Sequence, residues 1–169
     1  MDFAALCQKR KSCRSYTDTP VTEDELQTIL RAAVAAPSAC NMQSWYFYVL
    51  RSPESREKLT GLCAGWVKSA PVVIVVCTNG REIVGRFGDR ARDLFILQDT
   101  ALASENIMLQ AADLGLGSCF IGAFNEDGVR AALAIPADKR PVGLIPIGHS
   151  TDDTPKRDRA PIAEKIAIL

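Results

Sequence analysis

Four basic side chains lie close together near the start of the chain and surround a serine. They are Lys9, Arg10, Lys11 and Arg14, and the serine is Ser12. Guanidinium groups bind planar anions with two hydrogen bonds and a hydroxyl adds a donor, so the pattern is typical of a phosphate site. Three or four charged hydrogen bonds of about 1.5–3 kcal/mol each would hold a phosphate with micromolar or tighter affinity. The other interpretation is that these cations only complement the dipole of a helix that ends there.

A second basic cluster, Lys156, Arg157 and Arg159, stands near the other end of the chain. The whole chain has a formal net charge of zero, so no overall field attracts nucleic acid or an acidic membrane. No apolar run approaches the roughly 20 residues that a membrane helix needs. The basic residues near the start follow an apolar patch, which is the wrong order for a secretion signal. We therefore expect a cytoplasmic protein with neither nucleic-acid nor membrane partners.

A third group of polar side chains, Ser38, Asn41 and Gln43, separates an alanine-rich apolar run from an aromatic run that begins at Trp45. We call residues 38–43 the polar loop. A plain turn needs about two such side chains. The additional donors and acceptors indicate a partner beyond the turn itself.

Other chemistries fit the sequence less well. The six cysteines contain no C-x-x-C pair and only one histidine is present, so no metal site is expected. Glycines 115, 117 and 122 do not match the dinucleotide fingerprint, and they follow a helical segment where that motif requires a strand. Cys119 and His149 would suit a nucleophile and its base, but no third group that would orient them is apparent.

Helices and strands alternate along the chain. Asp2 is a candidate N-cap, Thr22 and Glu25 form a capping box, and Ser52-Pro53 opens a further helix. The longest helical pattern, 93–114, is apolar nearly all round, and Gly115 is its candidate C-cap. The helices are expected over 2–9, from Thr22 until Pro37, from Ser52, over 93–114 and over 125–135. The strands are expected over 45–50, 71–77, 118–124 and 142–147. The pattern predicts one α+β domain over residues 1–169.

The order of five motifs resembles the FMN-dependent nitroreductase family, in its compact branch. The motifs are RKSCRSY (10–16), APSACNMQSW (36–45), GLGSCFIG (115–122), PVGLIPIGH (141–149) and KRDRAP (156–161). The resemblance implies a nitroreductase-like fold, with a central mixed, mostly antiparallel sheet flanked by helices, in an intertwined homodimer. It also implies that the long helix runs through the dimer core and that the final IAEKIAIL reaches across the partner.

The resemblance further implies two FMN sites at the subunit interface. Arg10 and Ser12 would bind the ribityl phosphate with Lys11 alongside, and Arg14 would face the pyrimidine edge of the flavin. Arg157 and Arg159 match the C-terminal phosphate-binding cations of the family. The remaining candidates are Ser38, Asn41 and Gln43 from the other subunit, and Ile121 and Gly122, whose backbone N–H would lie near flavin N5. No catalytic side chain is nominated.

Three positions depart from the family pattern. Ser44 stands where proline is common, Lys11 replaces a common arginine, and Ala123 stands where some members have a second glycine. Lys11 keeps the charge but loses the bidentate geometry.

The implied activity is that of an FMN-dependent oxidoreductase that uses NAD(P)H in a ping-pong reaction. Its acceptors would be nitroaromatics, quinones or a related small electron acceptor, with the flavin carrying the chemistry. No 2′-phosphate pocket can be assigned, so NADH and NADPH both stay open as donors. The alternatives are a non-catalytic flavin-binding module and a specialised flavin enzyme such as a reductive dehalogenase.

Overall fold

The sheet at the centre of the fold has four strands in the order β1-β2-β4-β3. A computed structural model describes residues 2–169 of the chain. The strands are β1 (Trp45–Leu50), β2 (Val72–Thr78), β3 (Gly117–Ser118) and β4 (Arg140–Gly148). Every neighbouring pair is antiparallel, which agrees with the expected mostly antiparallel sheet.

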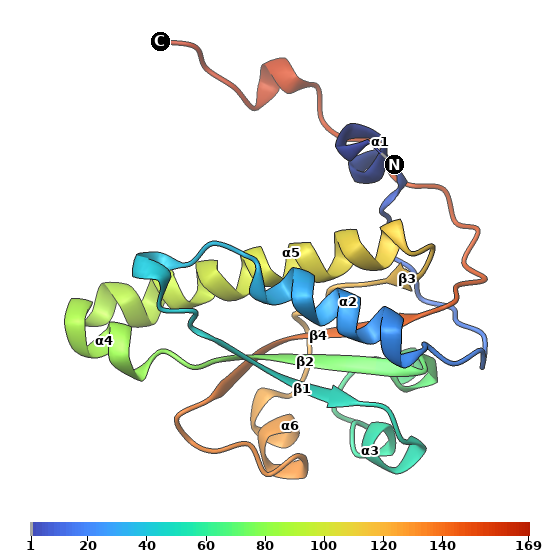
Figure 1. Cartoon of the computed structure of the whole chain (residues 1–169), viewed down its shortest axis with the longest axis horizontal. Coiled ribbons are helices and arrows are strands. Elements are labelled where there is room, and N and C mark those ends of the chain that lie inside the picture. The colour runs from blue at the N-terminus through green and yellow to red at the C-terminus, as the bar shows by residue number, and fades with distance from the viewer. Residues whose placement is uncertain (1) are drawn as a thin grey trace.

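Helices cover both faces of this sheet (Figure 1). On one face lie α2 (Glu23–Val34) and the long helix α5 (Ile96–Asp113), and on the other lie α3 (Pro53–Glu57) and α6 (Glu126–Ala132). The remaining helices are α1 (Phe3–Lys9) and α4 (Arg81–Phe87). The short turns are η1 (Ala39–Asn41), η2 (Gly65–Ser69), the π-helical η3 (Ala91–Phe95) and η4 (Ile162–Glu164).

Strand β2 is buried on both faces, as its continuous apolar run predicts. Val72, Ile74 and Val76 belong to the core beneath α2 and α5, whereas Val73 and Val75 belong to the core on the opposite face. Each fully buried valine contributes about 1.5–3 kcal/mol of transfer free energy, so this strand anchors both layers.

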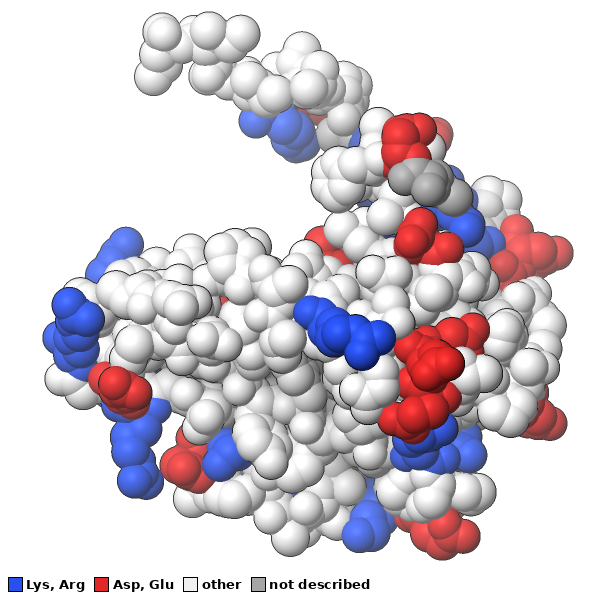
Figure 2. Space-filling model, viewed as in Figure 1, with Lys and Arg blue, Asp and Glu red and all other residues white. Residues whose placement is uncertain are grey.

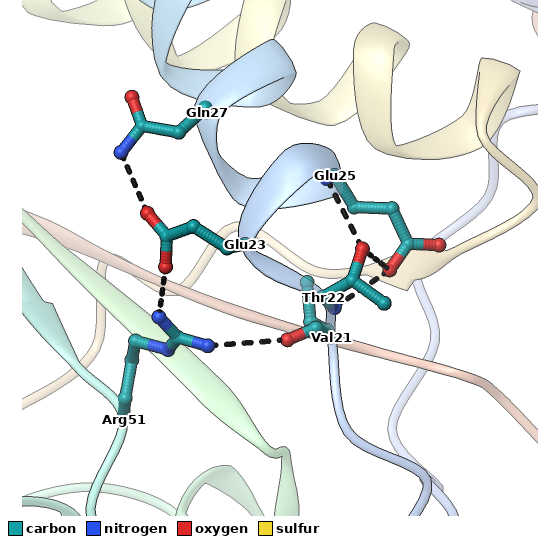
Figure 3. A network of polar contacts seen from close by, with 6 residues as sticks. All are labelled: Val21, Thr22, Glu23, Glu25, Gln27 and Arg51. Carbon is teal, nitrogen blue, oxygen red and sulfur yellow. Dashed lines mark hydrogen bonds and ion pairs between the residues drawn. The ribbon is translucent and has the colours of Figure 1, made fainter.

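The expected start of α2 is confirmed (Figure 3). The Thr22 hydroxyl accepts a hydrogen bond from the Glu25 N–H at 3.2 Å, and the Glu25 carboxylate accepts one from the Thr22 N–H at 2.8 Å. Arg51, just beyond β1, forms an ion pair with Glu23 and donates to the Val21 carbonyl at 3.4 Å. These bonds fix the first turn of α2 against the end of β1.

The other helix starts also match their caps. The Asp2 carboxylate accepts from the N–H of Ala5 at 2.9 Å, and the Ser52 hydroxyl accepts from the N–H of Ser55 at 3.1 Å, with Pro53 in the first helical turn. Among residues 2–169 none of the helices is long and apolar enough to cross a membrane.

The long helix differs in detail from its prediction. A π-helical stretch, η3, precedes it, and α5 itself begins at Ile96. Polar residues are buried along it: the hydroxyls of Thr100 and Ser104 donate to main-chain carbonyls one turn earlier, at 3.1 and 2.7 Å, which satisfies them without a partner helix. In the single chain, Leu102 and Glu105 are exposed, so α5 has one open side.

The predicted strand over 118–124 is wrong beyond its first residue. Ile121 exchanges two backbone hydrogen bonds with Leu144, at 2.9 and 3.0 Å, and the chain then leaves the sheet for the N-cap of α6, Asn125. Helix α6 ends at Ala132, earlier than predicted, and Ala134 then adopts a positive φ of 52°, a conformation that cannot continue a right-handed helix. Strand β4 is longer than predicted and includes Pro141. Proline is tolerated there because the pairing of β4 with β2 shifts register at this point.

Candidate functional site

A cationic cavity of about 230 Å³ lies where the two ends of the chain meet. Its lining is rich in arginine and lysine and includes no carboxylate. The lining residues are Arg10, Lys11, Ser12, Arg14, Thr154, Pro155, Lys156, Arg157 and Arg159. Basic side chains are visible in Figure 2 where the C-terminal segment passes α1. Six of the residues predicted from the sequence, Arg10, Lys11, Ser12, Arg14, Arg157 and Arg159, are thereby brought together.

The arginines of the cavity lack close anionic partners. The Arg10 Nε lies 4.0 Å from a Glu105 carboxylate oxygen, which is too far for a hydrogen bond, and the Arg10 side chain is only 15% exposed. Within the described part of the chain, the guanidinium groups of Arg14, Arg157 and Arg159 make neither a hydrogen bond nor an ion pair. Several uncompensated cations around one small cavity favour binding of an anion there.

Lys11 lines the same cavity but directs its ammonium at the main chain. The Nζ atom donates to the carbonyl oxygens of Asp152 at 2.6 Å and Thr154 at 2.8 Å. Lys156, from the C-terminal part of the chain, likewise donates to main-chain carbonyls of the N-terminal part, those of Cys7 at 2.7 Å and Gln8 at 3.0 Å. Of the six basic residues of the cavity, these two are therefore already hydrogen-bonded to protein.

Asp152 holds the turn behind the cavity. Its carboxylate accepts hydrogen bonds from the N–H groups of Thr154 at 3.0 Å and Arg14 at 2.8 Å. Hydrogen bonds from Thr154 and from the Arg14 N–H, together with the charge of Lys11, lower the pKa of Asp152 to about 2. The carboxylate is therefore ionised at neutral pH.

The polar loop has an unusual backbone. Cys40, Asn41 and Gln43 have positive φ angles of 52°, 56° and 51°, a region that costs most side chains about 1–2 kcal/mol. The Ser38 hydroxyl accepts from the N–H of Gln43 at 2.9 Å, and the N–H of Ala39 donates to Asp99 at 2.9 Å. Strained backbone that is held in this way is frequent at functional sites.

The polar loop and the cationic cavity share no lining residue in the single chain. The loop is bonded to Asp99 in the first turn of α5, whereas Arg10 lies beside Glu105, further along the helix. Figure 1 shows η1 and α1 over different ends of α5. The nine predicted residues of these two regions thus form two separate groups within one protomer.

Ile121 and Gly122 form a third group. Ile121 is buried, and both its N–H and its carbonyl are bonded to Leu144. Gly122 is exposed, and within residues 2–169 its N–H has no hydrogen-bond partner. A Cβ at Gly122 would meet only the Phe120 ring, at 3.8 Å, so packing within one chain does not require glycine.

Two functional candidates escaped the sequence reasoning. Asp99 is 2% exposed and accepts a hydrogen bond from the polar loop through one carboxylate oxygen. Its other carboxylate oxygen is buried and has no hydrogen-bond partner among the described residues. The sequence signal that could have identified Asp99 is an acidic residue within an otherwise apolar helical pattern. Lys156 belongs to the second basic cluster of the sequence. Its hydrogen bonds to α1 could not be predicted, because they join segments that are far apart in the chain.

The structure gives no support to a thiol or metal site. Burial raises the pKa of the Cys77 thiol to about 12. The Cys119 thiol is buried and donates to the Phe120 carbonyl at 3.7 Å, and no hydrogen bond joins it to His149 in the described chain. Among residues 2–169, no three potential metal ligands gather in one place. Ser44, where the resemblance implies that proline is common, is buried, and its hydroxyl has no hydrogen-bond partner in the part of the chain that the structure describes.

Comparison with known proteins relates the chain to one family. A protein from Methanothermobacter thermautotrophicus, described as a candidate NADH dehydrogenase/NAD(P)H nitroreductase, is 34% identical over 94% of this chain and 82% of its own length. An FMN reductase (NAD(P)H) of Bacillus subtilis is 32% identical over 89% of this chain and 67% of its own. The crystal structure of a nitroreductase family protein from Clostridium novyi NT superposes with a TM-score of 0.80 at 34% identity, covering 94% of this chain and 89% of that one. The family model described as Nitroreductase family matches residues 7–149, and the chain therefore belongs to the nitroreductase family.

Proposed function

We propose that this protein is an FMN-dependent NAD(P)H oxidoreductase, with residues 1–169 acting as one FMN-binding domain. Membership of the nitroreductase family supports the reaction class, as do relatives named FMN reductase and NAD(P)H nitroreductase. The observation that carries the proposal is the cavity at which both chain ends contribute arginines and no carboxylate intrudes.

The residues present fit the phosphate of FMN. Arg10, Arg14, Arg157 and Arg159 carry charges that no carboxylate in the described chain compensates at hydrogen-bond distance, and Ser12 adds a hydroxyl. A guanidinium binds a phosphate through two parallel hydrogen bonds, so arginine suits this ligand better than lysine does. These side chains would hold the phosphate and thereby fix the position of the attached ring.

A second copy of the chain would supply the polar loop to the same cofactor, in a homodimer. The loop lies apart from the cavity within one protomer, and Leu102 of α5 is 46% exposed nearby. Few charged side chains appear in Figure 2 along the edge formed by α5 and η1. The side chains of Ser38, Asn41 and Gln43 offer donors and acceptors suited to the polar edge of a heterocycle.

FMN, when bound, supplies the redox chemistry, because the side chains that line the cavity have none of their own. Arg14, always charged and without an ion-pair partner in the described chain, would stabilise negative charge at the edge of the ring. The free N–H of Gly122 is a candidate donor towards the ring. No side chain is assigned as a general acid, since water could supply protons to an open site.

The acceptors proposed are nitroaromatics, quinones or a related small molecule, bound alternately with the nicotinamide at one face in a ping-pong reaction. Spectrophotometry of the purified protein tests the proposal. We expect a flavin absorption spectrum that bleaches when NADH or NADPH is added without oxygen and returns on addition of a nitro compound or quinone. A yellow protein that ignores both nicotinamides would be a flavin-binding module instead, and recovery only with halogenated phenols would indicate a dehalogenase. A colourless protein that cannot be reconstituted with FMN would refute the proposal.

A further inference from the structure

The segment after β4, residues 149–159, pairs with the beginning of the chain; we call it the clasp segment. The N–H of Thr17 donates to the His149 carbonyl at 2.8 Å, and the N–H of Thr151 donates to the Ser15 carbonyl at 3.2 Å. The hydroxyls of Ser15 and Thr151 are 2.8 Å apart. Main-chain pairing therefore places the clasp segment beside residues 15–17, but it stops short of the cavity.

Beyond this pairing, two lysines connect the segments in opposite directions. Lys11, from the N-terminal side, holds the carbonyls of Asp152 and Thr154. Lys156, from the clasp segment, holds the carbonyls of Cys7 and Gln8 in the last turn of α1. Helix C-termini present unpaired carbonyls and a negative dipole end, so a cation is favoured there.

The arginines of the clasp segment are held through these bonds and through one further bond, in which the Arg14 N–H donates to the Asp152 carboxylate at 2.8 Å. In the described chain the side chains of Arg157 and Arg159 have no protein partner, and every residue after Lys156 is exposed. Lys156 precedes Arg157 directly, so its anchorage to α1 decides where both guanidinium groups lie relative to Arg10. Without the lysine bonds, the bond from the Arg14 N–H to Asp152 would still hold the clasp segment as far as its bond to Thr154, but no hydrogen bond or ion pair in residues 2–169 would hold the residues after Thr154 at the cavity.

We infer that Lys11 and Lys156 are positioning residues, which anchor the clasp segment so that Arg157 and Arg159 face Arg10 around the bound anion. The inference rests on the proposed function, because it assigns the anion as the FMN phosphate. It differs from the simpler assignment in which every cation of the cavity contacts phosphate. Two of the three protons of each ammonium are already used on carbonyls.

A mutant cycle on FMN affinity separates the two assignments. Lys156→Met should raise the Kd for FMN by about 10-fold, as expected for loss of charged hydrogen bonds. In a background that carries Arg157→Ala and Arg159→Ala, the same substitution should change the Kd by less than about 2-fold, because residues that act as one unit are not additive. A 10-fold effect that persists in that background would show that Lys156 binds phosphate itself and would overturn the inference. Riboflavin, which lacks the phosphate, should bind all variants equally.

Proteolysis of the cofactor-free protein tests the anchorage independently of FMN. An arginine-specific protease should cleave after Arg157 and Arg159 several-fold faster in Lys156→Met than in the unaltered protein. Lys165→Met is the matched control and should leave the rate unchanged, since the Lys165 ammonium makes no bond in the described chain. Unchanged cleavage in Lys156→Met would refute the anchorage even if FMN binds. Faster cleavage in a protein that never binds FMN would refute the proposed function and leave the anchorage standing.

Discussion

The carboxylate of Asp99 accepts a hydrogen bond from the N–H of Ala39 at 2.9 Å, which ties the first turn of α5 to the polar loop. The acceptor is 2% exposed and lies 60 residues away from the donor in the chain. This bond fixes the loop at the point where its backbone enters three left-handed residues. The loop's conformation therefore depends on one buried side chain of the long helix.

Removal of this acceptor should loosen the polar loop. Asp99→Ala leaves the N–H of Ala39 without its partner, which costs about 1–3 kcal/mol of unfolding free energy, and FMN affinity should fall with it. Asp99→Asn keeps one acceptor oxygen and should bind FMN nearly as well as the unaltered protein. Urea unfolding and fluorescence titration with FMN measure the two effects, with Gln98→Ala as an exposed control on the same helix. Equal FMN affinity in the alanine and asparagine variants would contradict this role.

The phosphate assignment predicts a selective loss of FMN. Arg10→Ala combined with Arg157→Ala removes two guanidinium groups, each worth about 1.5–3 kcal/mol for a charged hydrogen bond, so FMN should bind at least about 100-fold more weakly. Riboflavin affinity should stay the same. Arg130→Ala is the control, because Arg130 forms a surface ion pair with Asp127 on α6. Full FMN occupancy in the double variant would exclude these arginines as phosphate ligands.

Strain in the polar loop predicts a stabilising substitution. Cys40 is exposed and has a φ of 52°, which glycine adopts without a Cβ penalty, so Cys40→Gly should raise the unfolding free energy by up to about 1 kcal/mol. Cys40→Val, with a branched side chain, should lower it. A difference of 1 kcal/mol corresponds to about 2–4 °C in Tm for a chain of this size. Calorimetry of both variants measures their Tm values, and Cys40→Gly should have the higher one. The opposite order would mean that the side chain of Cys40 contributes to packing.

The capping box predicts a pH-dependent stability difference. Thr22→Ala should lower the unfolding free energy by about 1 kcal/mol at pH 7. Hydrogen bonds from Thr22 lower the pKa of Glu25 below its usual 4.5, so the Glu25 contribution is complete above 4.5 and is lost as the pH falls through the lowered value. The difference between the two proteins in urea titrations should therefore narrow as the pH falls below 4.5, because the bond from the Thr22 hydroxyl to the Glu25 carboxylate is lost on protonation. A constant difference across this pH range would mean that the bond from the Thr22 hydroxyl to the Glu25 carboxylate contributes nothing to stability.

In the proposed homodimer, the C-terminal tail is expected to form part of the interface. Residues 161–169 are exposed throughout, and Ile168 is 95% exposed, so their apolar surface lacks cover in one chain. Truncation after Ala160 should convert a dimer into monomers at micromolar concentration, whereas full-length Lys165→Met should remain dimeric. Sedimentation velocity measures both. A truncated protein that sediments as an unchanged dimer would place the interface elsewhere.

Local patterns predicted those elements whose determinants lie close together in the sequence. The capping box spans Thr22 to Glu25, and β2 is one uninterrupted apolar run, so both are visible without tertiary information. The predicted strand after Ser118 failed because its branched and aromatic residues find a pairing partner only at Leu144. Residue types report the tendency to form a strand but not the presence of a neighbouring strand.

The sequence predicts which residues form the candidate site but not the separate role of each residue. Arg10, Ser12 and Arg157 were recognised as one group through the family resemblance, and the structure brings them to one cavity. The sequence does not distinguish Lys11 from its arginine neighbours, yet its ammonium is bonded to main-chain carbonyls. Such a difference depends on contacts between segments about 140 residues apart, which no local pattern encodes.

The cavity is built from residues 10–14 and residues 154–159, so its walls come from the two ends of the chain. Because synthesis proceeds from the N-terminus, Arg157 and Arg159 leave the ribosome long after Arg10 and Arg14. Cofactor capture should therefore wait until residues 154–159 have emerged from the ribosome. An arrested ribosome complex that displays only residues 1–150 should not retain FMN, whereas one that displays residues 1–169 should take it up.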